Sequence, residues 1–247
     1  MAFAKGAATF NSCNKAGAIL HFNKYLEANP GDYNALMWRS SAHFITGQRQ
    51  DGLRDLDRAI AVSSGANKQL AIIKRSINDG SATRASAVER YKKVIQQYPD
   101  AWKGWNGIGD ILVQDKRNKE ALGYYKEALA IATRTNELSD PGICWLKKNM
   151  GDIYQESGDL NQAKASYESA IESCPSHTVS HISLCKVNIL QGNEHVARDY
   201  FRRAKELNPV LIGESSFEEY KRMVEQSSAG AGGSSGGSGG GGGDDGK

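Results

Sequence analysis

One spacing constrains this chain of 247 residues more than any other feature. A glycine or alanine recurs at intervals of 34, 35, 34, 42 and 34 residues, at Ala18, Gly52, Ala87, Ala121, Ala163 and Ala197. Each is followed four residues later by a large apolar side chain, at Phe22, Leu56, Tyr91, Tyr125, Tyr167 and Phe201. Residues four apart share one face of a helix. The spacing therefore predicts six helices of one kind, each with a small and a large residue side by side.

The prolines obey the same spacing. Four of the five stand at one place in the repeat, namely Pro30, Pro99, Pro175 and Pro209. Proline lacks an amide donor and cannot continue a helix, so these residues predict where each helix ends. One such unit cannot bury its own apolar face. Stacked neighbours must share the core, which predicts a repeat array instead of a single globular core.

The stretch NMGDIYQESGDLNQAKASYESAIESCP, residues 149–175, shows the unit most clearly. Its glycines, tyrosines, alanines and closing proline resemble the tetratricopeptide repeat, a family whose unit is two antiparallel helices in 34 residues. The resemblance implies an all-α fold: a right-handed superhelical solenoid of about six helix-turn-helix units with a C-terminal capping helix.

The resemblance covers about residues 1–212. We expect repeats at approximately 1–32, 33–66, 68–101, 102–143, 144–177 and 178–211. We also expect a capping helix over 213–227, where Ser215 or Ser216 with Glu218 or Glu219 forms a capping-box pattern. Residues 228–247 are rich in glycine and serine, with few side chains to bury, and are predicted to be a disordered tail.

Three places depart from the repeat pattern. In the first unit, Thr9 and Cys13 replace an aromatic residue and a glycine. In the third, Arg75 stands where a small residue is usual. The junction between the fourth and fifth units is eight residues longer than the others and resembles the longer-helix repeats of kinesin light chain. There we expect the helix to extend to about Glu137, with a turn over 139–142.

Composition excludes several classes of protein. The net charge of +3 is too small to indicate a nucleic-acid binder by itself. The four cysteines contain no C-x-x-C pair, which favours free thiols in a reducing compartment. The N-terminus lacks a basic and strongly apolar leader, and no apolar run approaches the ~18 residues of a membrane span. We therefore expect a cytoplasmic protein, or a nuclear one, without membrane insertion.

One segment has the composition of a metal site. Cys174, His177, His181 and Cys185 form C-x2-H-x3-H-x3-C, a plausible set of zinc ligands. The repeat spacing gives each of them another role, because Cys185 takes the place of a packing glycine and His177 falls in a turn. We therefore expect no zinc, and no other metal or cofactor.

No catalytic motif is present: the chain has no G-x-S-x-G, P-loop, G-x-G-x-x-G or H-E-x-x-H sequence. We expect a non-enzymatic adaptor. In the family that the chain resembles, the first helix of each unit lines a concave groove that holds a peptide or helix of a protein partner. The resemblance assigns that groove to Phe3, Phe10, Met37, Phe44, Lys103, Asn106, Asp110, Trp145, Lys148, Asn149, Asp152 and Lys186.

Two more specific roles remain to be weighed. A co-chaperone-like adaptor with a carboxylate clamp needs lysines and asparagines at set groove positions, but of the matching residues only Asn149 fits, so a clamp is disfavoured. The alternative is an RNA- or ribonucleoprotein-associated adaptor. Residues 67–119 carry 11 Lys and Arg against 5 Asp and Glu, with Trp102 and Trp105 nearby. Charge runs on helical arrays are usually solvated faces.

Overall fold

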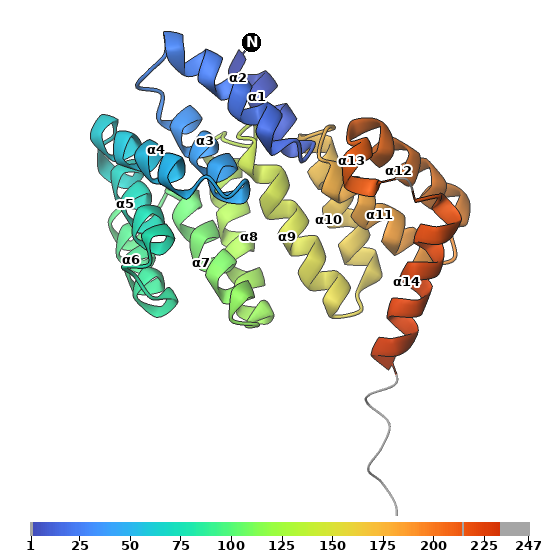
Figure 1. Ribbon diagram of the computed structural model, residues 1–247. Helices are drawn as coiled ribbons and strands as arrows, with labels where there is room; N and C mark the ends of the chain where they lie inside the picture. Colours follow the sequence, from blue (N-terminus) through green and yellow to red (C-terminus); the bar gives the residue numbers. More distant parts are fainter. Residues whose placement is uncertain (1, 214, 233–247) are drawn as a thin grey trace, which may run out of the picture.

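The computed structural model describes residues 2–213 and 215–232, and all regular structure within them is helical (Figure 1). The helices are α1 (Ala2–Asn11), α2 (Lys15–Ala28), α3 (Tyr33–Ile45), α4 (Arg49–Val62), α5 (Gly65–Asp79), α6 (Arg84–Gln97), α7 (Trp102–Gln114), α8 (Asn118–Arg134), α9 (Gly142–Glu156), α10 (Leu160–Ser173), α11 (Thr178–Leu190), α12 (Glu194–Leu207), α13 (Pro209–Ile212) and α14 (Phe217–Gly232). Most of the predicted Gly/Ser tail, residues 233–247, lies outside the described residues.

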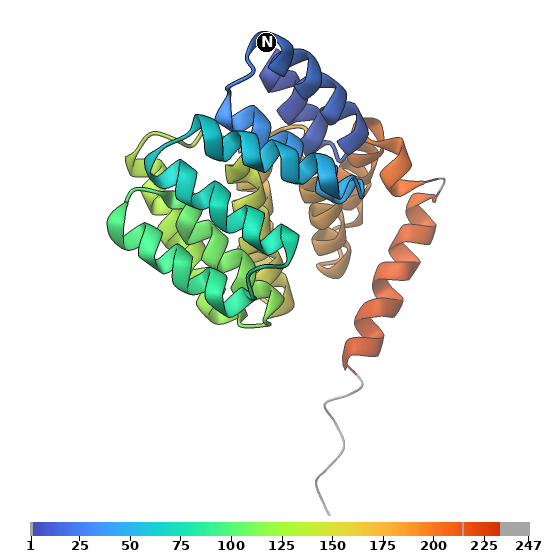
Figure 2. The ribbon, with the colours of Figure 1, turned by 60° about the vertical axis from the view of Figure 1, so that its left-hand side comes forward.

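Consecutive helices pack as antiparallel pairs, from α1–α2 to α11–α12, and each pair stacks on the next. The array curves strongly, so that the first pair returns to lie beside the fifth and sixth pairs (Figures 1 and 2). This confirms the predicted all-α superhelical solenoid. The curvature also brings together residues more than 130 positions apart, a point that decides the shape of the candidate site.

The repeated small and large residues form the core. All six large residues of the spacing are buried, as are the five alanines that precede them. In three pairs the aromatic ring covers a glycine of the partner helix: Phe22 lies on Gly6, Tyr125 on Gly109 and Tyr167 on Gly151. A Cβ atom at these glycines would come within 2.5–2.8 Å of the ring. Helix separation in these pairs is therefore set by the absence of a side chain.

The turn inside each pair needs one residue with a left-handed backbone. Glycine supplies it in four turns, but the first and fourth pairs use other residues. The residues concerned and their φ angles are Cys13 at 64°, Gly47 at 79°, Gly80 at 84°, Lys116 at 59°, Gly158 at 83° and Gly192 at 75°. Left-handed geometry costs a residue with a Cβ atom energy that glycine avoids. Cys13, which replaces a glycine of the repeat pattern, therefore adopts the same left-handed conformation as the glycines of the other turns.

The third pair is built differently from the others. Arg75 occupies the place of the usual small residue and points outward, where it forms ion pairs with Asp57 and Asp79. With no small residue at this position of α5, the Tyr91 ring of α6 covers Gly107 of the next helix pair. As a result α5 and α6 pack less closely than the other pairs.

The junction between the fourth and fifth pairs corrects one prediction. Helix α8 ends at Arg134 and does not continue to Glu137. Asn136 adopts a left-handed conformation with φ of 59°, which terminates the helix, and Pro141 then precedes the first residue of α9. The eight extra residues of this repeat are divided: α8 is three residues longer than α10, the connection 135–141 is three longer than 174–177, and α9 is two longer than α11.

Helix α14 covers the end of the array. Phe217 and Val224 are buried in a cluster with Phe201 of α12. The predicted capping box is confirmed at its start, since Glu219 accepts the Ser216 amide at 2.7 Å and Ser216 Oγ accepts the Glu219 amide at 3.2 Å. The helix runs to Gly232, five residues past the end of the predicted capping helix, 213–227, and so includes the first residues of the predicted tail.

Candidate functional site

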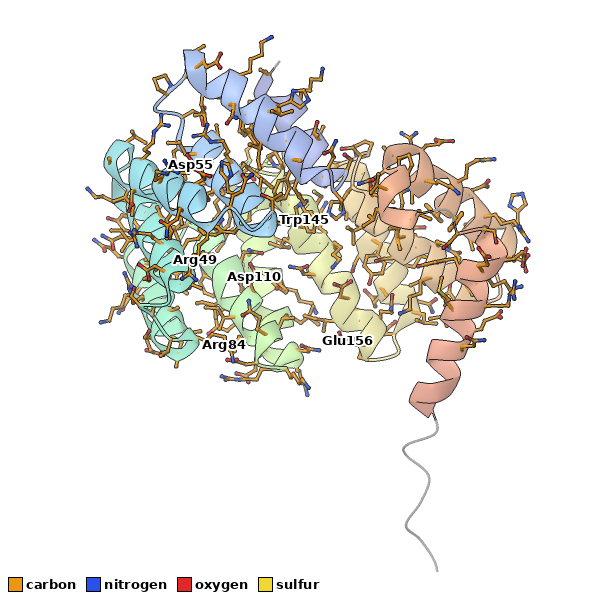
Figure 3. All side chains as sticks on the ribbon, in the orientation of Figure 1. Arg49, Asp55, Arg84, Asp110, Trp145 and Glu156 are labelled. Carbon is orange, nitrogen blue, oxygen red and sulfur yellow. The ribbon has the colours of Figure 1, made fainter. Side chains whose placement is uncertain are left out.

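The concave face holds a groove of about 500 Å³ formed mainly by α3, α5 and α7. Helices α1 and α9 close one end of it, where Trp145 lies, and Asp110 lies further along its length (Figure 3). Half of its lining residues are apolar or aromatic: Phe10, Tyr33, Met37, Trp38, Ile45, Leu70, Ile77, Tyr91, Trp102, Ile111 and Trp145. Concave, largely apolar sites with a few polar groups are the usual form of a ligand site.

The structure brings half of the predicted groove residues together. Those lining the groove are Phe10, Met37, Lys103, Asn106, Asp110 and Trp145. Two of the remaining aromatics pack elsewhere. Phe3 lies against Phe22 and Tyr25 within the first pair, and Phe44 covers Gly52 between α3 and α4. The role of all twelve residues in binding a partner stays a prediction.

The other predicted polar residues lie on α9 and α11, outside the groove. Lys148 forms an ion pair with Asp152 at 2.5 Å. Asp152 also accepts the Tyr167 hydroxyl at 2.8 Å, so that pair braces the fifth repeat. Asn149 donates its amide to Asp110 at 3.3 Å. Lys186 is on α11 and is not part of the groove lining.

Asp110 is the centre of a hydrogen-bond network at the groove wall. Its carboxylate accepts the Tyr125 hydroxyl at 2.8 Å, the Asn149 amide at 3.3 Å and the Asn106 amide at 3.0 Å. Burial raises the pKa of Asp110, and these hydrogen bonds oppose that rise because they favour the ionised form. The network ties α7 to α8 and α9 and fixes the wall on which a ligand would rest.

Lys74 is a groove residue that the sequence analysis missed. Its ammonium donates to Ser41 Oγ at 2.7 Å, and burial lowers the pKa of Lys74 to about 8. The other two cations of the lining are neutralised, since Lys103 pairs with Asp140 at 2.8 Å and Arg84 with Asp115 at 2.7 Å. No ion pair forms at Lys74 within the part of the chain that the structure describes. In the sequence, the feature that could have pointed to Lys74 is its position next to Arg75, which stands where the repeat usually has a small residue.

A second polar group in the groove also lacks a partner. The Tyr33 hydroxyl is buried and makes no hydrogen bond to any described residue. An unmade hydrogen bond at a buried hydroxyl is costly, and such groups are rare in folded proteins. Among the described residues, the groove therefore offers a cation without an ion-pair partner, Lys74, and an unsatisfied hydroxyl, Tyr33, beside its apolar side chains.

The N-terminal hairpin, α1 and α2, closes the array through contacts that we call the seam. Asn11, only 2% exposed, accepts the Trp145 indole N–H at 2.8 Å and donates to Cys174 Sγ at 3.4 Å. Two further bonds reach backbone carbonyls of the hairpin, from Ser176 Oγ at 3.4 Å and from Asn208 Nδ2 at 2.7 Å. The seam thus joins the first pair to the fifth and sixth.

Aromatic rings in edge-to-face contact fill the centre of the seam. The Trp145 ring meets His177 edge-on at 4.4 Å and Phe10 at 6.1 Å. The Lys15 ammonium lies 3.5 Å from the centre of the Phe10 ring and 4.8 Å from that of Trp145. His177 is fully buried, and burial lowers its pKa to about 3, so its ring is neutral. Trp145 is therefore occupied within the chain, although it also lines the groove.

The C-x2-H-x3-H-x3-C segment is dispersed in the structure. His177 Nδ1 is bonded to Ser180 Oγ at 2.7 Å, His181 Nε2 lies 3.1 Å from the Pro175 carbonyl oxygen, and Cys185 is buried in the cluster below α14. Over residues 2–213 and 215–232, no group of three or more His, Cys, Asp or Glu side chains could hold a metal ion.

The basic region, residues 67–119, is neutralised in part. Five of its eleven cations form ion pairs, namely Arg75, Arg84, Lys92, Lys103 and Arg117. Most of these pairs are exposed and contribute little to stability. They do interrupt the positive surface that a phosphate backbone would need.

Comparison with known proteins finds a family model that matches part of the chain. Residues 103–176, which include most of α7 and all of α8 to α10, match the family model described as tetratricopeptide repeat. These residues are tetratricopeptide repeats. Repeats of this family serve in general as non-enzymatic scaffolds for interaction between proteins. No curated protein matches the chain.

Solved structures extend the tetratricopeptide-repeat fold to the rest of the array. The yeast Tom70 structure is 14% identical and covers 87% of this chain and 44% of its own, with a TM-score of 0.57. The Cut9–Hcn1 tetramer of the APC/C is 13% identical, covers 86% of this chain and 39% of its own, and has a TM-score of 0.57. BtubC from P. vanneervenii is 14% identical, covers 85% and 94%, and has a TM-score of 0.52. At these identities the likeness concerns the fold alone.

None of the helices in the described part of the chain is long and apolar enough to cross a membrane.

Proposed function

We propose that this chain is a non-enzymatic adaptor whose groove binds a segment of a protein partner. The observation that carries the proposal is the apolar lining of the groove, which includes aliphatic side chains that nothing in the repeat core requires there. Ile45, for example, lines the groove and is 61% exposed. Exposed apolar surface in a concavity is typical of interaction sites.

The polar groups of the groove indicate what the segment carries. Lys74 is a cation without an ion-pair partner, and the Tyr33 hydroxyl is a donor without an acceptor. An acidic side chain supplies both of the missing interactions. We therefore propose an apolar peptide segment with one Asp or Glu that lies beside Lys74, anchored by burial of its apolar side chains.

A displayed peptide library tests this proposal. The chain is used to select peptides, and the dissociation constants of the selected peptides are then measured for two variants. Ile45→Glu places a charge in the groove, whereas Leu20→Glu makes the same change at an exposed leucine of α2, outside the groove lining. We expect at least a tenfold weaker affinity for Ile45→Glu and no change for Leu20→Glu. Equal affinities for the two variants would contradict the groove assignment.

The charge at Lys74 is tested with the same peptides. Lys74→Met keeps the length of the side chain and removes the ammonium. We expect it to weaken peptides that contain Asp or Glu and to leave their Asn or Gln counterparts unaffected. Binding of RNA by filter retention, lost in Lys74→Met and Lys93→Glu alike, would instead support the RNA-associated alternative.

A further inference from the structure

Two of the four cysteines meet at the seam. Cys144 lies in the first turn of α9, and Cys174 directly follows the last residue of α10. Because these helices are antiparallel, the start of one lies beside the end of the other. Cys144 Sγ is 3.0 Å from the Pro141 carbonyl oxygen, and Cys174 Sγ is 4.0 Å from the same oxygen. The two thiol groups thus meet at one backbone oxygen.

The surroundings of the two sulfurs differ in a way that assigns them different chemistry. Cys144 is fully buried, and burial raises the pKa of its thiol. Cys174 is only partly buried, and its sulfur accepts a hydrogen bond from the Asn11 amide at 3.4 Å. The neighbouring Cys144 thiol is the main reason that the pKa of Cys174 is lowered, and the Lys147 ammonium adds to it. The thiolate is the nucleophilic form of cysteine.

The pKa is not lowered at either of the other two cysteines, Cys13 and Cys185. Burial raises the pKa of Cys13, which lies in the first turn. Burial also raises the pKa of Cys185 to about 12, and its neighbours are the apolar residues below α14. Cys13 and Cys185 therefore serve as internal controls for the reactivity of Cys174.

We propose that Cys174 is a hydroperoxide-reactive thiol and that Cys144 converts its oxidised form into a disulfide within the fifth repeat. In the first step the Cys174 thiolate attacks one oxygen of the peroxide. The O–O bond breaks, the departing oxygen takes up a proton, and Cys174 becomes a sulfenic acid. In the second step the Cys144 sulfur attacks Cys174, the S–O bond breaks, and the hydroxyl group leaves as water with the Cys144 proton. Two thiols are oxidised and one peroxide is reduced.

The site does not depend on the groove or on its ligand. Its structural consequence lies at the seam, because a disulfide sulfur accepts the Asn11 amide less well than a thiolate does. The new bond also links the start of α9 to the end of α10 and restrains the fifth repeat in the unfolded chain. Oxidation thus strengthens one repeat while it weakens the contact that the N-terminal hairpin makes with that repeat.

Peptide mass spectrometry of the full chain tests this proposal. Cys174 and Cys185 fall in one tryptic peptide, residues 165–186, so the experiment uses Cys185→Ala, a change compatible with the small-residue position there. The chain is treated with one equivalent of hydrogen peroxide, free thiols are alkylated, and the digest is analysed with and without a reductant. We expect a linked peptide pair joining Cys144 and Cys174, with two hydrogens fewer than the separate peptides.

Two variants separate the steps. With Cys144→Ser we expect a sulfenic acid at Cys174, trapped by dimedone, and no linked pair. With Cys174→Ser we expect Cys144 to stay reduced. Circular dichroism confirms that both variants are folded. Equal oxidation of Cys13 and Cys174, or dimedone labelling of Cys144 in the Cys174→Ser variant, would overturn the assignment.

Discussion

At the scale of single residues, the turn inside each helix pair shows how far the repeat tolerates exceptions. Four turns use glycine for the left-handed position, whereas Cys13 and Lys116 hold the same conformation with a side chain attached. Such a residue costs about 1–2 kcal/mol relative to an unstrained backbone. The neighbouring hydrogen bonds of the turn still form, as between the Lys116 amide and the Val113 carbonyl at 3.0 Å. The strained backbone at these two residues therefore leaves the hydrogen bonding of the turn intact.

Replacing Lys116 with glycine releases the strain. We expect Lys116→Gly to raise the free energy of unfolding by about 0.5–1 kcal/mol, since glycine's greater freedom in the unfolded chain offsets part of the gain. The matched control is Gly158→Ala, where φ is 83° and no atom crowds the position. That change should lower stability by about 1–2 kcal/mol. Urea denaturation measures both, and a loss for Lys116→Gly would show that the turn is not strained.

At the scale of helices, the third pair explains where the groove comes from. Arg75 stands at the place where α5 would otherwise carry a small residue, with Lys74 beside it, and α5 and α6 pack less closely than the other pairs. The Tyr91 ring of α6 lies instead against Gly107 of α7, in the next pair. Lys74, Leu70, Ile77 and Tyr91 then all face the groove. An irregular repeat has thus become the wall of the candidate site.

Gly107 should be as sensitive as the glycines of the regular repeats. A Cβ atom there would lie 2.7 Å from the Tyr91 ring, so Gly107→Ala should cost about 1–3 kcal/mol through overpacking. Gly123 on α8 is also within a helix, but nothing lies within 4 Å of its Cβ position. Gly123→Ala should instead gain about 0.5–1 kcal/mol. Thermal unfolding of the two variants checks the contrast, and similar effects at both glycines would argue against the Tyr91 contact.

The repeat spacing predicted the helices well because each lies within one local pattern. The signals are all short-range: small and large residues at fixed intervals, the prolines and the capping box. The structure confirms the burial of Ala18 and Phe22 and the hydrogen bond between Ser216 and Glu219. Two features escaped. The end of α8 depends on the conformation of Asn136, and Lys74 faces the groove only because of how α5 and α6 separate. Six predicted groove residues lie elsewhere because register cannot tell a groove face from a contact between pairs.

At the scale of the molecule, the seam is the feature that no local pattern indicates. The bond between Asn11 and Trp145 joins residues 134 positions apart, and the one between Asn208 and the Ser12 carbonyl joins residues 196 apart. Such contacts depend on the accumulated curvature of all six pairs. They also give Trp145 a structural role, so a substitution there would disturb the hairpin as well as the groove.

His177 makes the seam sensitive to acid. Its folded pKa of about 3 lies below the ordinary value of 6.5, so the unfolded chain binds more protons between these values. Stability from this group is therefore complete above pH 6.5 and is lost as the pH falls toward 3, by about 2 kcal/mol between pH 7 and pH 5. We expect His177→Phe, which keeps a ring against Trp145, to lose about 2 kcal/mol less over that range. Denaturation curves at the two pH values measure the difference, and parallel losses in both proteins would exclude this role.

The seam changes how stability is shared along the array. In an open solenoid each repeat touches only the units before and after it, so the free energy of unfolding is a sum of local terms and the end units fray first. Here the first pair also contacts the fifth and sixth. The array is in this respect cyclic, and its N-terminal unit has two interfaces where an open array would give it one. Loss of the C-terminal units would therefore loosen the first helices as well, and the protein should unfold with the cooperativity of a single domain.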